Sequence, residues 1–189
     1  VRDLPGTNVL GHGQKVVIPS RALGELQRLL NQGDEVTLCL AEDRATFAVG
    51  NATLSTSLLQ VEFPNYRQLI QPSYPNTLTV AREALLEAVR RCRIFARETT
   101  PVRLEMTATS LKLSVITQDI GNSEEEIDCS LEGTEMIVGF NPEYLAAGIE
   151  AVTGDEITIQ TTDPQRPAVL RGVGADDYLY LVMPQRLTV

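Results

Sequence analysis

Side chains capable of acid–base or nucleophilic chemistry are few and widely separated in this chain. His12 is the single histidine and lies in a glycine-rich segment, so neither a Ser/His/Asp triad nor a Cys/His pair finds a base within a recognisable motif. The glycine-rich segment 6–13 resembles a phosphate-binding loop only loosely. It lacks the Lys-Ser/Thr pair after its last glycine and does not lie between a strand and a helix. We therefore predict that the protein is not an enzyme.

Acidic and thiol side chains also fail to form a metal site. Residues 124–126 are three consecutive glutamates, but alternate side chains of a strand point to opposite faces, so only Glu124 and Glu126 share one. A solvated sheet face is the simpler interpretation. Cys39, Cys92 and Cys129 stand alone in apolar segments without a CxxC pair, which predicts buried thiols in a reducing cytosol. We expect no metal and no cofactor.

A repeat of about sixty residues organises the elements that any site must use. Segments 15–30, 76–92 and 135–152 each combine a short apolar run with an amphipathic helical pattern, and β-like runs follow each of them. The pattern predicts an α+β fold made of repeated strand–helix–three-strand units with antiparallel sheets. The expected helices are 20–32, 81–97 and 141–153, and the expected strands include 15–18, 36–40, 45–49, 52–59, 102–107, 110–116, 122–129, 156–161, 168–172 and 178–183.

Composition supports a packed core and a segregated charge. The chain has 189 residues, 43% of them hydrophobic, and a formal net charge of −9, while no apolar run approaches the ~18 residues of a membrane span. The N-terminus lacks the features of a signal peptide and has no initiator Met, so we expect a fragment or a processed chain. Helix 81–97 is net basic and helix 141–153 is acidic. The three helices together are net basic and the remainder is strongly acidic.

Three motifs carry a family resemblance that spans nearly the whole chain. FPNYRQLI at 63–70, GFNPEYL at 139–145 and YLYLVMPQRL at 178–187 resemble signatures of the bacterial DNA polymerase III beta subunits, the sliding clamps. The resemblance implies the DNA-clamp fold, with antiparallel sheets outside and helices on the inner face. It implies that residues 1–72 are the second half of the middle domain and 73–189 the third domain. The first domain and half of the second would then be missing.

The resemblance implies a processivity factor that encircles duplex DNA as a ring dimer when full length. The arginines expected to face DNA are Arg21, Arg28, Arg82, Arg90 and Arg93. The alternative, that these are ordinary solvated helix arginines, stays open. Ile94 and Phe95 match the subunit interface, although both could instead lie under a neighbouring loop. We expect the fragment to be monomeric or weakly associated, and to be cytoplasmic and nucleoid-associated.

The family also docks short peptides of the DNA polymerase III alpha subunit, the clamp loader and other DNA polymerases in an apolar pocket. The resemblance places these residues there: Pro64, Leu69, Tyr144, Gln165, Pro167, Leu181, Met183, Pro184, Gln185 and Arg186. Gln165 and Gln185 stand where relatives often have apolar residues. Part of the pocket wall would lie in the missing half, so we expect a weak or incomplete site. A stand-alone adaptor that competes for clamp partners without encircling DNA is the alternative function.

Overall fold

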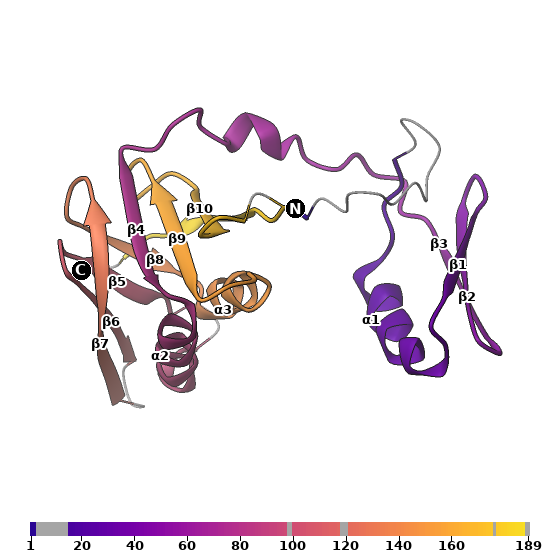
Figure 1. The fold of residues 1–189 in the computed structure, drawn as a ribbon, viewed down its shortest axis with the longest axis horizontal. Coiled ribbons are helices and arrows are strands. Elements are labelled where there is room, and N and C mark those ends of the chain that lie inside the picture. The colour runs from indigo at the N-terminus through magenta and orange to yellow at the C-terminus, as the bar shows by residue number, and fades with distance from the viewer. Residues whose placement is uncertain (3–14, 98–99, 118–120, 176, 188–189) are drawn as a thin grey trace. The chain divides into compact units, whose positions relative to one another are not determined.

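The computed structural model describes residues 1–2, 15–97, 100–117, 121–175 and 177–187 (Figure 1). The chain divides into two compact units. The N-terminal unit is Pro5–Asn65, and the C-terminal unit comprises Val1–Leu4 and Tyr66–Val189. Each unit is described by itself below. The domain boundary expected at residue 72 stays a prediction.

The N-terminal unit holds one helix and one antiparallel sheet. Its elements are α1 Ser20–Leu29, the 3-10 helix η1 Leu30–Gln32, β1 Val36–Leu40, β2 Arg44–Val49 and β3 Ala52–Ser57, with the strands in the order β1-β2-β3. Ala45, Phe47 and Val49 alternate with more exposed residues and are buried on one sheet face. Gly50 adopts a φ of 55° in the β2–β3 turn, a conformation that glycine reaches without steric cost.

The strand predicted at 15–18 is not formed, so this part of the repeat prediction is wrong. Among the described residues, the Leu59 N–H donates to the Val17 carbonyl at 2.8 Å, and no further ladder accompanies this bond. A strand exists only as part of a hydrogen-bonded pair, so apolar β-branched residues alone do not make one. The predicted burial of the three cysteines holds for Cys92, is met only in part by Cys129, which is half-buried, and is wrong for Cys39, which is exposed on β1.

The C-terminal unit contains two copies of the strand–helix–three-strand repeat. The 3-10 helix η2 Tyr66–Leu69 precedes them. The first copy is β4 Asn76–Ala81, α2 Arg82–Phe95, β5 Val102–Met106, β6 Ser110–Thr117 and β7 Gly121–Glu132. The second is β8 Met136–Phe140, α3 Pro142–Glu150, β9 Glu156–Thr161, β10 Ala168–Gly172, β11 Tyr180–Val182 and β12 Pro184–Gln185. Strands β1, β9 and β10 begin and end where the sequence predicts.

The two repeats of this unit are joined reciprocally in one sheet of order β11-β10-β9-β4-β7-β6-β5-β8-β12. The leading strand β4 pairs with β9 of the other repeat, with Val80 opposite Ile157. The leading strand β8 pairs in the same way with β5, with Phe140 opposite Val102. All these pairs are antiparallel, as the sequence predicts. Each repeat therefore completes the sheet edge that the other leaves open.

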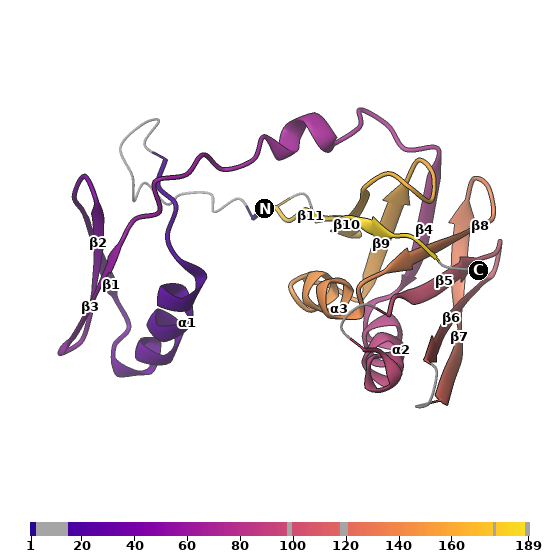
Figure 2. The ribbon, with the colours of Figure 1, turned by 180° about the vertical axis from the view of Figure 1, so that it is seen from behind.

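Helices α2 and α3 lie side by side on the same face of this sheet (Figures 1 and 2). Leu85, Val89 and Cys92 lie on one face of α2 and are fully buried. Leu145 and Ile149 of α3 are buried beside them. The core is therefore a single layer of apolar side chains between two helices and a twisted sheet. No helix among the described residues is long and apolar enough to cross a membrane.

Candidate functional site

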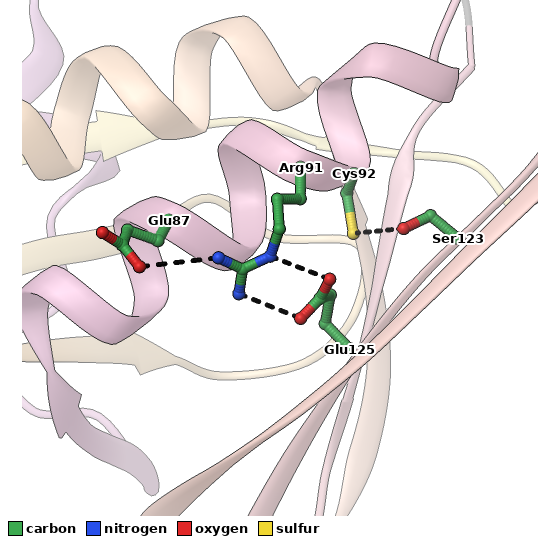
Figure 3. Close-up of polar contacts among 5 residues, drawn as sticks. All are labelled: Glu87, Arg91, Cys92, Ser123 and Glu125. Carbon is green, nitrogen blue, oxygen red and sulfur yellow. Dashed lines mark hydrogen bonds and ion pairs between the residues drawn. The ribbon is translucent and has the colours of Figure 1, made fainter.

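An ion-pair cluster fixes α2 to the sheet (Figure 3). The Arg91 guanidinium donates from Nε and Nη2 to the two carboxylate oxygens of Glu125 on β7, each at 2.9 Å. Glu87, one turn earlier on α2, accepts from Nη1 at 3.5 Å. The hydrogen bonds from Arg91 hold the pKa of Glu125 below its usual range. Sequence analysis missed this role of Arg91, although the alternation of β7 already separated Glu125 from its neighbours.

The neighbouring thiol of Cys92 is unreactive. Cys92 is buried and its Sγ lies 3.8 Å from the Ser123 hydroxyl (Figure 3). Burial raises the pKa of the Cys92 thiol, so it stays protonated at neutral pH and is a poor nucleophile. The cluster therefore positions α2 and carries no chemistry.

The outer face of β7 behaves as its alternation predicts. Glu124 and Glu126 are exposed, and Glu124 accepts from the Lys112 ammonium of β6 at 2.8 Å. The hydrogen bond to Glu124 raises the pKa of Lys112. Within the described ranges, no group of three or more acidic, histidine or cysteine side chains is placed to hold a metal ion. His12 and the segment 6–13 lie outside the described residues.

Four of the five arginines expected to face DNA are exposed, and most of the five are already paired with glutamates. Arg28 contacts Glu25 at 2.8 Å, Arg90 contacts Glu150 at 2.8 Å and Arg93 contacts Glu143 at 3.1 Å. Arg82 pairs with Glu83 at 3.1 Å, its Nε also donates to the Gly154 carbonyl at 2.9 Å, and its side chain is only 25% exposed. Arg21 is exposed and makes no ion pair with the described residues.

Helices α2 and α3 together carry no net formal charge. α2 holds four arginines and two glutamates, and α3 holds two glutamates. The pairs Arg90–Glu150 and Arg93–Glu143 bridge the two helices. Both pairs are about half exposed, so each contributes little to stability and a phosphate could replace the carboxylate. Because the acidic helix α3 pairs with α2, the surface of the two helices is less basic than that expected from α2 alone.

A groove of about 560 Å³ lies at the end of the C-terminal unit's sheet. Its lining includes four of the expected pocket residues, Gln165, Pro184, Gln185 and Arg186, and four others, Ile137, Gly139, Pro164 and Leu187. The pairing of β12 with β8 builds this wall, because Gln185 lies opposite Gly139. A Cβ at Gly139 would approach the Gln185 carbonyl to 3.0 Å, so glycine allows the close contact. Sequence analysis missed Ile137 and Gly139 because only the β8–β12 register brings them to the groove.

One polar atom in this groove has no partner. Gln185 Oε1 is buried and accepts no hydrogen bond within the described part of the chain. A buried acceptor without a donor costs about 1–3 kcal/mol.

The turn that carries Gln165 is held by a chain of hydrogen bonds. Asp163 Oδ1 accepts from the backbone N–H groups of Gln165 and Arg166 at 2.8 and 3.0 Å. Thr161 Oγ1 donates to the Asp163 carbonyl at 3.1 Å. Asn76 Nδ2, on β4, donates to the Thr161 and Thr162 carbonyls. The groove wall is therefore anchored to the middle of the sheet.

The other expected pocket residues lie outside the groove lining. Met183, between β11 and β12, is 58% exposed, while Pro167 and Leu181 are half-buried. Tyr144 is exposed on α3 and lines a second hollow with Arg93, Arg97 and Asn141. Leu69, in η2, is exposed. Pro64 belongs to the N-terminal unit and is exposed there. The predicted set is therefore divided between two hollows and isolated surface positions.

Ile94 and Phe95 differ from one another. Ile94 is 76% exposed on α2. Phe95 is half-buried and lies beside Gly121, where an added Cβ would meet its ring at 3.7 Å. Thr117 Oγ1 donates to the Phe95 carbonyl at 2.6 Å. The alternative of packing beneath a neighbouring segment therefore describes Phe95, whereas Ile94 is an exposed apolar side chain.

Comparison with protein families finds two matches that together cover nearly the whole chain. Residues 67–186 match the C-terminal domain of the DNA polymerase III beta subunit, and residues 1–65 match its central domain. The Beta sliding clamp of Synechococcus elongatus is 33% identical over 178 residues, which are 91% of this chain and 48% of the relative. That of Treponema pallidum is 27% identical over 176 residues, which are 90% of this chain and 47% of the relative. The chain spans about half the length of the curated relatives it matches.

Solved structures agree. A DnaN sliding clamp from Bartonella birtlesii, bound to griselimycin, has a TM-score of 0.83 and 29% identity over 93% of this chain and 48% of its own. A beta sliding clamp of Caulobacter crescentus has a TM-score of 0.88 over 98% of this chain and 50% of its own. Its identity of 23% supports the fold alone. The predicted DNA-clamp fold is confirmed.

Proposed function

This chain belongs to the DNA polymerase III beta subunit family, the bacterial sliding clamps, and we propose on that basis that it is part of a DNA processivity factor. In this proposal it is a non-catalytic, cytoplasmic and nucleoid-associated subunit. Residues 1–72 are the second half of a middle domain and 73–189 a complete third domain. A full-length form would encircle duplex DNA as a homodimer through surfaces that include Ile94 and Phe95. The chain by itself would be monomeric or weakly associated.

The groove beside β12 carries the proposed peptide docking. Part of its wall is formed by the Pro-Gln-Arg-Leu segment 184–187, in which Pro184 and Leu187 provide apolar contacts while Arg186 supplies charge at the rim. Leu69, Tyr144, Pro167, Leu181 and Met183 extend this surface in the proposal, and Pro64 stays a predicted pocket residue. Peptides of the polymerase alpha subunit, the clamp loader and other polymerases would dock there.

The DNA-facing role is proposed for Arg21, Arg28, Arg82, Arg90 and Arg93. Exposed ion pairs such as Arg90–Glu150 can exchange a carboxylate for a phosphate at little cost. Contacts of this kind do not read bases, which suits a protein that slides. Arg82 is the least accessible of the five, since the Gly154 carbonyl already holds it.

Peptide titration tests the docking proposal. A fluorescent clamp-binding peptide from a DNA polymerase III alpha subunit is titrated with this chain and with a full-length clamp, and anisotropy is measured. We expect saturable binding to both proteins and weaker binding to this chain, which spans about half the length of its relatives. No binding at several hundred micromolar would refute the docking proposal. Equal affinities would refute the incomplete-pocket prediction alone.

DNA binding distinguishes the clamp from the stand-alone adaptor. Retention on nicked circular duplex, measured with and without subsequent linearisation, reports encirclement. If the chain acts as part of a clamp, a version extended to the length of its relatives should stay on circles and slide off linear DNA. The adaptor alternative predicts peptide binding, competition with the full clamp and no topological retention in either version.

A further inference from the structure

The second hollow, which Tyr144 lines, has a volume of about 850 Å³ and lies where α2 ends and α3 begins. Its lining consists of Arg93, Ala96 and Arg97 on one side and residues 141–144 on the other. Two of these side chains are guanidinium groups and one is a carboxylate, so the lining has a formal charge of +1. In the proposed docking only Tyr144 has a role, and the charge of this hollow has none.

Arg97 is the cation of this hollow that has no carboxylate partner among the described residues. Arg93 donates to Glu143 at 3.1 Å, whereas Arg97 is exposed and makes no ion pair with any residue that the structure describes. The backbone around Arg97 is held, because the Thr100 N–H donates to the Arg97 carbonyl at 2.9 Å and the Ala96 N–H donates to the Arg93 carbonyl at 3.1 Å. Arg97 therefore borders the hollow from a fixed turn, with its guanidinium donors unused.

Apolar atoms lie beside this guanidinium. Ala96 is half-buried, Pro142 is buried and the Tyr144 side chain is 64% exposed. The polar group of Asn141 is already engaged, since its Oδ1 accepts from the backbone N–H groups of Glu143 and Tyr144 at 2.9 and 3.2 Å. The hollow therefore offers one unpaired positive charge next to an aromatic ring and a proline.

Tyr144 connects this hollow with the C-terminal segment of the chain. Burial raises the pKa of the Tyr180 hydroxyl on β11, and the Tyr144 hydroxyl raises it further, so the two phenols lie near one another. Tyr180 is followed three residues later by Met183, which belongs to the proposed docking surface. At most about 11 Å of extended chain separates these two residues. A docked peptide of ordinary length can therefore contact both Met183 and the hollow.

We propose that Arg97 is a specificity-determining residue that binds a carboxylate of the docked peptide, so that the preferred partner segment carries an acidic side chain next to an apolar one. The inference rests on the proposed peptide docking and names the chemistry of its ligand. A guanidinium holds a carboxylate through two parallel N–H···O bonds. The Tyr144 ring and Pro142 pack against the neighbouring apolar side chain. Arg97 is not one of the arginines proposed to face DNA.

The charge of the surroundings favours a single carboxylate over the backbone of a nucleic acid. Helices α2 and α3 together carry no net formal charge, and Glu143 in the lining has a side chain that is 65% exposed. A nucleic-acid strand carries a negative charge at every nucleotide, so phosphates next to one bound at Arg97 would approach Glu143. A peptide places one carboxylate among neutral residues and avoids this repulsion.

A carboxylate scan of the docking peptide tests the proposal. The fluorescent peptide of the titration above is made with each acidic residue replaced by its amide, and a single aspartate is then placed at each position in turn. Anisotropy titrations with the 189-residue chain compare each aspartate peptide with its matched asparagine peptide. We expect aspartate to tighten binding about 3- to 10-fold at one position or at two neighbouring ones. In Arg97→Gln, the matched peptides should bind equally.

Charge reversal at the responsive position provides a second measurement. Arg97→Glu should prefer lysine to aspartate there, whereas the control Arg44→Gln, which removes an exposed charge of the N-terminal unit, should keep the preference for aspartate. No aspartate gain at any position, or a gain that survives Arg97→Gln, would overturn the proposal and leave the peptide docking intact. Failure of every peptide to bind would refute the docking and this inference together.

A labelled oligothymidylate, titrated in the same way, separates the two kinds of anion. We expect Arg97→Gln to leave its affinity for the chain within about twofold, because the hollow is not a phosphate site in this proposal. Oligothymidylate binding that depends on Arg97, together with peptides that show no aspartate gain, would identify a phosphate site and overturn the proposal.

Discussion

Asn76 is the buried polar side chain whose replacement should most clearly separate hydrogen bonding from packing. It is 4% exposed, and its Nδ2 donates to the Thr161 and Thr162 carbonyls at 3.2 and 3.1 Å. Its Oδ1 accepts from the Thr134 N–H at 2.8 Å. Asn76 therefore joins β4 to the end of β9, to the turn before β8 and to the turn that carries Gln165.

Asn76→Asp keeps the size of the side chain but replaces the Nδ2 donor with a second acceptor oxygen. Two donated bonds worth about 1 kcal/mol each are lost, and a carboxylate faces two carbonyl oxygens in a buried site. We expect the free energy of unfolding of the C-terminal unit to fall by about 3 kcal/mol at pH 7. Asn76→Ala should cost about 2–3 kcal/mol through lost bonds and unsatisfied partners. The exposed control Asn122→Asp should change stability by less than about 0.5 kcal/mol.

The pH dependence distinguishes the two variants of Asn76. Burial beside carbonyl oxygens should raise the pKa of the introduced carboxyl above its unfolded value of about 3.9. A group with a raised pKa is destabilising above the unfolded value, so the deficit of Asn76→Asp should grow as pH rises from about 4 toward 7. At pH 3.5 the protonated acid can donate one bond again, and the deficit should shrink. The deficit of Asn76→Ala should change little with pH.

Urea unfolding followed by tyrosine fluorescence is the assay. All five tyrosines, Tyr66, Tyr74, Tyr144, Tyr178 and Tyr180, lie in the C-terminal unit, and the chain has no tryptophan, so the signal reports that unit. Asn76→Asp within about 0.5 kcal/mol of the unaltered chain at pH 7 would refute the reasoning. Equal pH dependence in both variants would refute the assigned orientation of the amide.

Three further predictions concern binding and electrostatics. Met183 is 58% exposed, and full burial of such a side chain stabilises by about 1.5–3 kcal/mol, of which a docked peptide can supply about half. Met183→Ala should therefore weaken peptide binding about 5- to 20-fold in an anisotropy titration, and the control Val173→Ala should leave the affinity unchanged. Because Arg91 lowers the pKa of Glu125, the stability that this carboxylate adds is present above its unfolded pKa and is lost as pH falls through its folded pKa. Urea titrations should therefore show that Glu125→Gln is less stable than the unaltered chain at pH 7 and equally stable near pH 2. A stability difference that does not change with pH would contradict this cause. Glu143→Gln combined with Glu150→Gln removes the partners of Arg93 and Arg90, so the affinity for duplex DNA should rise and its salt dependence should steepen. Binding isotherms are measured at about 50 and about 200 mM salt. Isotherms that do not change would exclude these arginines from the DNA surface.

The sequence alone determined the repeated units and most element positions. Apolar spacing at 3.6 residues located α2, and alternation located β9 and β10 to the residue. Alternation also separated Glu125 from Glu124 and Glu126, because side chains of a strand must point to opposite faces. The motif at the end of the chain predicted Pro184, Gln185 and Arg186 as neighbours in one site, and the groove contains all three.

Only the tertiary structure decided which elements found partners. Segment 15–18 has the residues of a strand and remains irregular, because a strand depends on a neighbour that no local pattern supplies. Cys39 is apolar in its sequence context and exposed in its sheet, since burial depends on what covers the face. The pairing of Arg90 and Arg93 with glutamates of α3 also required the fold. Local periodicity depends on neighbouring residues, whereas the β4–β9 register and the Arg90 and Arg93 ion pairs join residues 50 or more positions apart.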